Sequence, residues 1–281
     1  MKLGTNDIGS VYLGTNEISK VYLGTNLVWE SAFDADYQSV LDYATTQGYT
    51  LPSVSQQALQ NQLVINLKAA GVWSKLDTFA VFATDGDSDF GLIDWIRLSQ
   101  YTAVNSPTFI TNVGFQGNAS SSYINTNYNP TLGTNFLQND AAIGIYTYDN
   151  PYKVNQFVYG NIISSNRISG NWNNAGTANY FRLNDNNSSF PVNRISNNGL
   201  ITINRTSGTN VEVYNGNSLF ETSSVSSSGL PNGDIYILAT NSTSGSILYA
   251  ENKISMYFMS SEISSEISNL NTSVNSYMSS I

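Results

Sequence analysis

Carboxylates, tyrosines and arginines are the side chains with which this chain could do chemistry, because it contains no Cys and no His. That composition excludes thiol nucleophiles, disulfides, imidazole or thiolate metal sites and Ser-His-Asp catalysis. Glycoside hydrolysis needs two carboxylates about 5–10 Å apart. The string Glu-x-Asp-x-x-Glu, common in sandwich-type hydrolases, is absent, and Asp94 has no acidic residue two positions away. We therefore expect no enzymatic activity.

The densest acidic cluster is Asp85, Asp87 and Asp89, which alternate with Gly86 and Ser88. Alternate aspartates can present oxygen ligands to Ca²⁺, but the rest of the segment does not follow the EF-hand pattern. An Asp-Gly-Asp turn needs no metal, since Asp favours turns and Gly supplies a positive φ. A plain turn is our preferred interpretation, with a Ca²⁺ site as the alternative, and we expect no other cofactor.

A second candidate site combines two aromatic residues, Trp172 and Tyr180, with two arginines, Arg167 and Arg182, in an Asn-rich region. A sugar site needs a flat ring for the apolar C–H face and donors for the hydroxyl groups. The alternative is that both rings turn inward and pack beneath a loop. These four residues are our candidates for contact with a host surface glycan.

The bulk composition limits the partners. Charged residues make up 11% of the chain, against roughly 25% in an average domain, so Asn, Ser, Thr and Gln must supply the polar surface. The net charge of −9 repels phosphate backbones, which argues against nucleic acid. No apolar run reaches the roughly 18 residues of a membrane span, so we expect no membrane insertion.

Residues 1–30 contain a repeat of ten residues, marked by Gly4, Gly14 and Gly24. Each unit joins a Gly-Thr-Asn turn to an alternating segment, which predicts short β-strands. Such strands bury too little surface alone, so they either fold onto their own domain or pair with other chains. We favour an anchoring or oligomerisation segment with contacts from its larger side chains, which are Ile8, Val11, Tyr12, Ile18, Val21, Tyr22, Val28 and Trp29.

The next region, 31–77, is predicted to be a helical linker. Tyr37, Val40, Leu41 and Ala44 have helical spacing, and Gly48 is a plausible stop. After Pro52, Ser53 and Gln56 form a capping-box pattern. A second stripe follows, formed by Leu59, Leu63, Leu67 and Ala70.

The remaining domain, 78–281, has the pattern of a β-sandwich. Short apolar or alternating segments, from 78–83 to 253–259, are separated by turn residues. The Asn- and Ser-rich stretches 164–189 and 222–229 are predicted to be exposed loops. Ile263, Ile267, Leu270 and Val274 predict a C-terminal helix that packs on the sandwich, and Trp73, Phe79 and Trp95 are expected in the core.

Three parts of the chain resemble a group of phage virion proteins found in phages of Bacteroidetes-type hosts. They are the repeat ending at 21–29, the segment 51–83, and the region from Gly114-Phe115-Gln116-Gly117-Asn118 to the C-terminus. The last part resembles a concanavalin A-like, or laminin G-like, jelly roll, with Ile203-Asn204-Arg205 before the 211–216 hairpin. The resemblance implies a tail or head fibre or a capsid decoration protein, and a homo-oligomer, with a trimer favoured.

The expected fold is therefore mainly β: a jelly-roll sandwich with a small N-terminal β-repeat, a short helical linker and a C-terminal helix. The expected function is structural, as an exposed fibre, appendage or capsid decoration protein of a bacteriophage particle that contacts other virion proteins and contributes to host attachment. The alternative is a carbohydrate-binding receptor-recognition module. A glycan hydrolase is a third hypothesis, although the Glu-x-Asp-x-x-Glu motif of such enzymes is absent from the sequence.

Overall fold

The computed structural model describes residues 33–149, 156–163, 165–172, 178–186, 190–193, 195, 198–242 and 248–281, together with short strands before residue 31. For those early strands, and for 171–172 and 190–193, it describes the backbone alone. The early strands pair as the ten-residue repeat predicts, in three antiparallel two-stranded ladders. These are β1 (Lys2–Leu3) with β2 (Asn6–Asp7), β3 (Val11–Leu13) with β4 (Asn16–Ile18), and β5 (Lys20–Leu23) with β6 (Asn26–Glu30).

Helix α1 (Ala35–Gln47) ends at the predicted Gly48, and α2 (Val54–Ala69) begins after the predicted cap Ser53 and ends one residue before Ala70. Gly48 takes a left-handed conformation (φ 79°) after α1, which suits a residue without a Cβ. Ser53 caps α2 by accepting a hydrogen bond from the amide of Gln56 at 3.3 Å. The reciprocal half of the capping box does not form, because the Gln56 side chain bonds Asn112, Thr84 and the amide of Asp85 instead.

Two antiparallel sheets form the body of the domain. The first, of eight strands, runs β11-β12-β23-β14-β19-β20-β21, with β7 paired to β23. Its strands are β7 (Leu76–Val81), β11 (Thr108–Ile110), β12 (Gly114–Gln116), β14 (Ala141–Thr147), β19 (Gly199–Arg205), β20 (Asn210–Asn215), β21 (Ser218–Ser224) and β23 (Lys253–Ser260).

The second sheet has seven strands in the order β10-β13-β22-β15-β16-β17-β18. They are β10 (Thr102–Val104), β13 (Tyr123–Asn125), β15 (Tyr159–Asn161), β16 (Arg167–Trp172), β17 (Ala178–Asp185), β18 (Phe190–Asn193) and β22 (Tyr236–Ile237). The short helix α3 (Ser88–Gly91) and the pair β8 (Ile93–Asp94) and β9 (Ser99–Gln100) connect β7 to this sheet.

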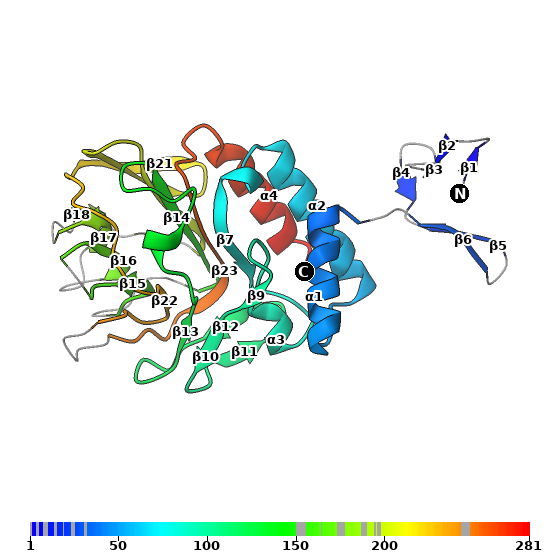
Figure 1. Cartoon of the computed structure of the whole chain (residues 1–281), viewed down its shortest axis with the longest axis horizontal. Coiled ribbons are helices and arrows are strands. Elements are labelled where there is room, and N and C mark those ends of the chain that lie inside the picture. The colour runs from blue at the N-terminus through cyan, green and yellow to red at the C-terminus, as the bar shows by residue number, and fades with distance from the viewer. Residues whose placement is uncertain are drawn as a thin grey trace.

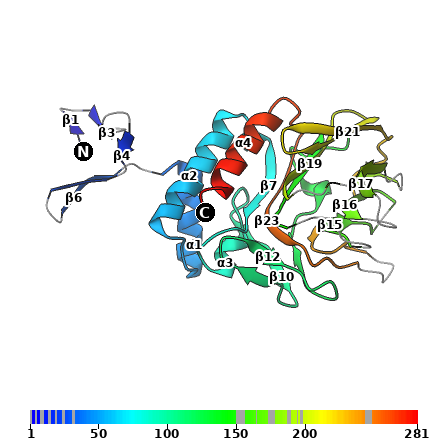
Figure 2. The same ribbon diagram turned by 180° about the vertical axis from the view of Figure 1, so that it is seen from behind.

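The elements form three layers, with α1, α2 and the C-terminal helix α4 (Ile267–Met278) on one side of the eight-stranded sheet and the seven-stranded sheet on the other (Figures 1 and 2). One apolar cluster fills the space between the sheets and includes Ile143, Ile203 and Tyr257. A second cluster joins the outer face of the eight-stranded sheet to the helices and includes Phe79 and Leu270. The fold is thus a jelly-roll sandwich of the concanavalin A-like type, as predicted.

The aromatic residues expected in the core lie between the helices and the eight-stranded sheet. The ring of Phe79 packs edge-on against Trp73 at 6.0 Å and against Trp95 at 5.5 Å. Tyr37 of α1 reaches the same cluster, 5.5 Å from Trp95. These contacts fix the helical layer to β7.

The prediction of a long exposed loop over 164–189 is wrong, because β16 and β17 occupy most of this stretch. Ile168, Phe181 and Leu183 point into the core between the sheets. The many Asn and Ser residues mask this period-2 pattern. The predicted loop at 222–229 begins only after Ser224, because β21 continues to that residue.

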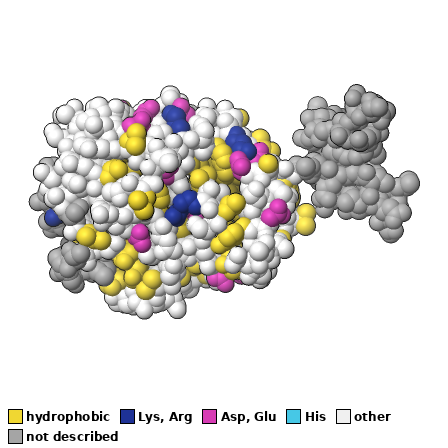
Figure 3. All heavy atoms as spheres, in the orientation of Figure 1, with side chains coloured by type: hydrophobic (Ala, Val, Ile, Leu, Met, Phe, Trp, Pro, Cys, Tyr) yellow, Lys and Arg dark blue, Asp and Glu magenta, His cyan; other side chains and the backbone are white. Residues whose placement is uncertain are grey.

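The surface is mostly neutral and polar, with few charges and scattered apolar side chains on the visible face (Figure 3). This agrees with the low charged fraction of the sequence. No helix within the described residues is long and apolar enough to cross a membrane.

Candidate functional site

Two neighbouring strands of the seven-stranded sheet, β13 and β22, alternate between buried and partly exposed side chains. Ile124 lies opposite Ile237, and both are fully buried in the core. Asn125 lies opposite Tyr236, and both side chains are partly exposed. Successive residues of a strand point to opposite faces, so Tyr123 and Asp234 share this outer face with them.

Three tyrosines gather on this face. The rings of Tyr123 and Tyr236 stack with centroids 4.5 Å apart and an interplanar angle of 29°. The ring of Tyr249 lies next to that of Tyr123, with centroids 6.3 Å apart and an interplanar angle of 44°. Partial burial, together with the neighbouring Tyr123 and Asp234, raises the pKa of Tyr236 to about 12, so its hydroxyl stays protonated at neutral pH.

Amide and carboxylate groups lie next to the rings. The Asn125 side-chain amide donates to Asp234 Oδ2 at 3.1 Å, and its Oδ1 accepts from the backbone amide of Asn127 at 3.0 Å. Asn127 donates through its side chain to Thr102 Oγ1 at 3.0 Å. We define the tyrosine face by its six members, which are Tyr123, Asn125, Asn127, Asp234, Tyr236 and Tyr249.

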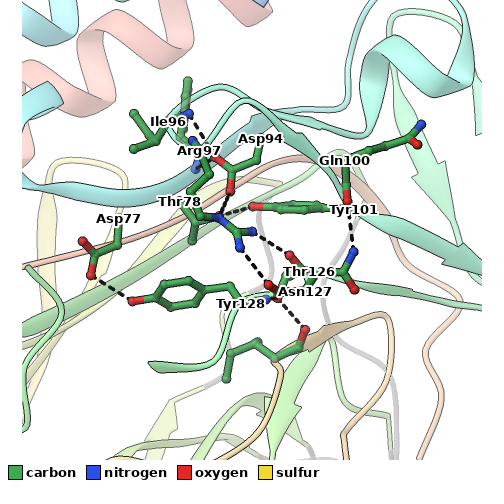
Figure 4. Close-up of polar contacts among 12 residues, drawn as sticks. Asp77, Thr78, Asp94, Ile96, Arg97, Gln100, Tyr101, Thr126, Asn127 and Tyr128 are labelled. Atoms are coloured by element: carbon green, nitrogen blue, oxygen red, sulfur yellow. Dashed lines mark hydrogen bonds and ion pairs between the residues drawn. The ribbon is translucent and has the colours of Figure 1, made fainter. Parts of the chain in front are cut away.

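The chain that follows β13 is held by Arg97 (Figure 4). Its two terminal nitrogens donate to the carbonyl oxygens of Asn127 and Thr126, both at 2.7 Å. Its Nε donates to Asp94 Oδ2 at 2.6 Å. Burial alone lowers the pKa of Arg97, but the charge of Asp94 reverses this and the pKa is raised overall. Arg97 therefore positions the polar end of the tyrosine face.

Asp94 is fully buried, and hydrogen-bond donors surround its carboxylate. Besides Arg97 Nε, it accepts hydrogen bonds from Thr78 Oγ1 at 2.5 Å and from the backbone amides of Ile96 and Arg97 at 2.9 and 3.2 Å. Thr78 is in turn bonded to the hydroxyl of Tyr101. A carboxylate saturated by donors in this way holds structure together.

Asp77 organises the chain on the other side of Arg97. It accepts from the Tyr128 hydroxyl at 2.9 Å and from the backbone amides of Thr134 and Phe136 at 3.1 and 2.8 Å. A hollow of about 240 Å³ opens beside it, also lined by Arg97 and Tyr128. Among the described residues that line this hollow, Asp77 is the one carboxylate, so the hollow holds no pair of carboxylates that could act as acid and base.

The four residues predicted to contact glycan lie on two paired strands, not in a loop. Trp172 is opposite Tyr180, and Ser169 is opposite Arg182, across β16 and β17. Arg167 and Tyr180 are partly exposed, whereas Arg182 is only 7% exposed and its pKa is lowered by burial and by nearby Arg167. The Trp172 side chain lies outside the described residues.

The three aspartates of the acidic cluster accept hydrogen bonds from different donors. Asp85 accepts from the amide of Ser53, and Asp87 accepts from the amides of Thr50 and Phe90. Asp89 accepts from the Gln100 side chain. No group of three acidic residues in the described part of the chain could hold a metal ion. Asp87 caps α3, and Gly86 does not take the positive φ that the turn interpretation assumed. The hydrogen bonds of Asp85 and Asp87 tie the α1–α2 connection to this segment.

The proposed anchoring side chains between Ile8 and Trp29 lie outside the described residues, so their contacts remain a prediction. The tyrosine face itself is not among the sequence-based candidates. The sequence does show alternation at Tyr123 and Asn125, and again at Asp234 and Tyr236, which is a signal for strands with one outward face. The pairing of these strands is not visible there, because Asn125 and Asp234 are 109 residues apart.

The fold defines a concanavalin A-like sandwich, and comparisons with solved structures agree. A mutant of Trypanosoma rangeli sialidase displaying trans-sialidase activity is 12% identical with a TM-score of 0.50, over 80% of this chain and 40% of the sialidase. Domain 4 of AbnA, an extracellular arabinanase from Geobacillus stearothermophilus in complex with arabinotriose, is 11% identical with a TM-score of 0.45, over 70% of this chain and 98% of that domain.

The binding domain of botulinum neurotoxin serotype D is 11% identical with a TM-score of 0.45, over 70% of this chain and 51% of that one. The chain spans well under half of the sialidase, and at these identities the likeness concerns the fold alone. The sequence matches no protein-family profile and no curated protein.

Proposed function

We propose that this protein is a carbohydrate-recognition module and that it binds glycan on the tyrosine face. The observation that carries the proposal is the stacked, partly exposed pair Tyr123 and Tyr236 next to the hydrogen-bonded pair Asn125 and Asp234. Aromatic rings pack on the apolar face of a sugar, and amide and carboxylate groups exchange hydrogen bonds with its hydroxyls.

The tyrosine face is preorganised for a ligand, because its residues are held in place by the rest of the fold. Arg97 holds the chain after β13, and the ladder to β22 sets the position of Tyr236. A rigid site loses little conformational entropy when it binds. This matters for a sugar ligand, whose hydroxyls are well hydrated and offer a small net gain per hydrogen bond.

A glycan array probed with the full chain tests the proposal, with Tyr236→Ala as the decisive variant. We expect hits that Tyr236→Ala weakens by roughly tenfold or more, since truncating an aromatic contact residue at the centre of a binding site costs about 2 kcal/mol. Tyr43→Ala is the matched control. Tyr43 also pairs with a tyrosine, Tyr49, at 6.4 Å, but it lies on α1 in the helical layer. No hits, or equal losses in both variants, would refute the proposal.

We further propose that the module belongs to an exposed fibre, appendage or capsid decoration protein of a virion, and that it contributes to host attachment. The supporting observation is the series of three β-ladders at ten-residue spacing, a periodic segment that offers edges for other chains. Mass spectrometry of purified particles and mass photometry of the free protein test this role. Absence from the particles would exclude the location, and a monomer at micromolar concentration would exclude the trimer.

Hydrolysis is not part of the proposed function. Asp77, the one carboxylate among the described residues that line the hollow, accepts hydrogen bonds at both oxygens and has no carboxylate partner there. We expect the protein to leave the reducing-end count of any glycan that it binds unchanged. Release of new reducing ends that persists in highly purified protein would contradict this.

A further inference from the structure

The tyrosine face carries one kind of charge. Its members are tyrosines and asparagines apart from Asp234, whose side chain is partly exposed. Asp234 accepts one side-chain hydrogen bond, from Asn125 to Oδ2, so Oδ1 has no donor among the described residues. A carboxylate oxygen in this position accepts hydrogen bonds from sugar hydroxyls, and it also places a negative field at the rings.

Neither Arg97 nor Arg182 neutralises that field. Arg97 is the cation held against the same stretch of chain, and it is already paired with Asp94 at 2.6 Å. Arg182 lies on the same sheet, but the register Tyr236, Gly160, Ser169, Arg182 places it three strands away. Three interstrand steps are roughly 14 Å, beyond the screening length of about 8 Å in physiological salt.

The route along the sheet to Arg182 is also covered. A Cβ added to Gly160 would lie 3.0 Å from the Thr240 methyl group, and Thr240 is fully buried. Ser169 is 2% exposed and Arg182 is 7% exposed. A ligand on the tyrosines therefore meets Asp234 well before it meets Arg182.

We infer that the tyrosine face selects neutral glycans, an inference that rests on the proposed function. Asp234 is the residue that discriminates against glycans bearing a carboxylate or sulfate. Asp234 and Asn125 exchange hydrogen bonds with sugar hydroxyls, while an anionic substituent near Asp234 meets like-charge repulsion that neither Arg97 nor Arg182 offsets. The net charge of −9 for the whole chain acts in the same direction.

The experiment compares neutral oligosaccharides with sialylated or uronate-bearing versions of the same backbones, at two salt concentrations. We expect the acidic version to bind roughly tenfold more weakly at low salt, with the difference reduced at high salt. Asp234→Asn should narrow the difference between the two ligands. Asp42→Asn is the charge-matched control, because Asp42 is exposed on α1, and it should leave the difference unchanged.

Acidic glycans that bind as well as neutral ones, and whose binding is lost in Tyr236→Ala, would overturn the selectivity and leave the proposed function standing. A difference that Asp234→Asn and Asp42→Asn reduce equally would also overturn it, since the effect would then come from net charge. Failure of every glycan to bind would overturn the proposed function itself.

Discussion

The hydroxyl of Tyr37 donates a hydrogen bond of 2.7 Å to Oε1 of Gln60, and this buried contact joins α1 to α2. The amide of the same Gln60 donates to the Tyr277 hydroxyl at 3.1 Å and to Thr84 Oγ1 at 3.3 Å. Tyr277 in turn donates to the carbonyl oxygen of Ala83 at 2.6 Å. A single glutamine thus links three helices to the end of β7.

Gln60→Ala should therefore destabilise the protein far more than an exposed glutamine would. The substitution leaves the hydroxyl of Tyr37 without its buried partner, at about 1–3 kcal/mol, whereas Thr84 keeps its bond to Gln56. Urea unfolding followed by tyrosine fluorescence measures the loss. Gln62→Ala is the control, since Gln62 sits on the same helix and bonds Asn66 at the surface; its change should stay within about 0.5 kcal/mol. Equal losses would show that the network adds nothing.

Gly144→Ala should also be destabilising, for a steric reason. A Cβ at Gly144 would lie 2.0 Å from the ring of Phe258 on the neighbouring strand. Overpacking of this kind costs about 1–3 kcal/mol. Phe258→Leu in the same chain should recover part of that loss, because it removes the ring, and thermal unfolding of the single and double variants tests this. Purely additive losses would contradict the steric explanation.

Removing Asp94 should leave Arg97 as an uncompensated, partly buried charge. We expect Asp94→Ala to cost about 3–5 kcal/mol, the range for breaking a buried pair. Hydrogen exchange should show faster loss of protection around Thr126 and Asn127, whose carbonyl groups Arg97 holds. Glycan binding at the tyrosine face should weaken in the fraction that remains folded. Unchanged protection at Thr126 and Asn127 would show that Arg97 does not position the tyrosine face.

Alkaline pH should unfold the protein in a defined window. Burial raises the pKa of Tyr277, Tyr159 and Tyr128 well above the usual value near 10, and that of Tyr214 to about 12. A raised pKa in the folded state means that stability is complete below pH 10 and falls as the pH rises towards and beyond 12. Absorbance at 295 nm should rise together with loss of near-ultraviolet circular dichroism. Full ionisation of a protein that stays folded would contradict this.

Local signals in the sequence predict the helices and most strands, because a stripe such as Tyr37, Val40 and Leu41 needs no distant partner to be visible. They fail at β16 and β17, where Asn and Ser outnumber the inward-pointing Ile168 and Phe181. The tyrosine face depends on which strands become neighbours. That choice is made by the packing of two whole sheets, and no window around Tyr123 or Tyr236 contains it.

The position of β23 in the eight-stranded sheet has a consequence for synthesis of the chain. This strand ends at Ser260, near the C-terminus, yet it pairs with β12, β14 and β7 in the middle of the sheet. On the ribosome, β7 and β14 emerge long before the strand that joins them. The nascent polypeptide must therefore leave β7 without its strand partner, and β12 and β14 each with one unpaired edge, until β23 has been synthesised. A transcript truncated before β23 would yield a product prone to aggregation.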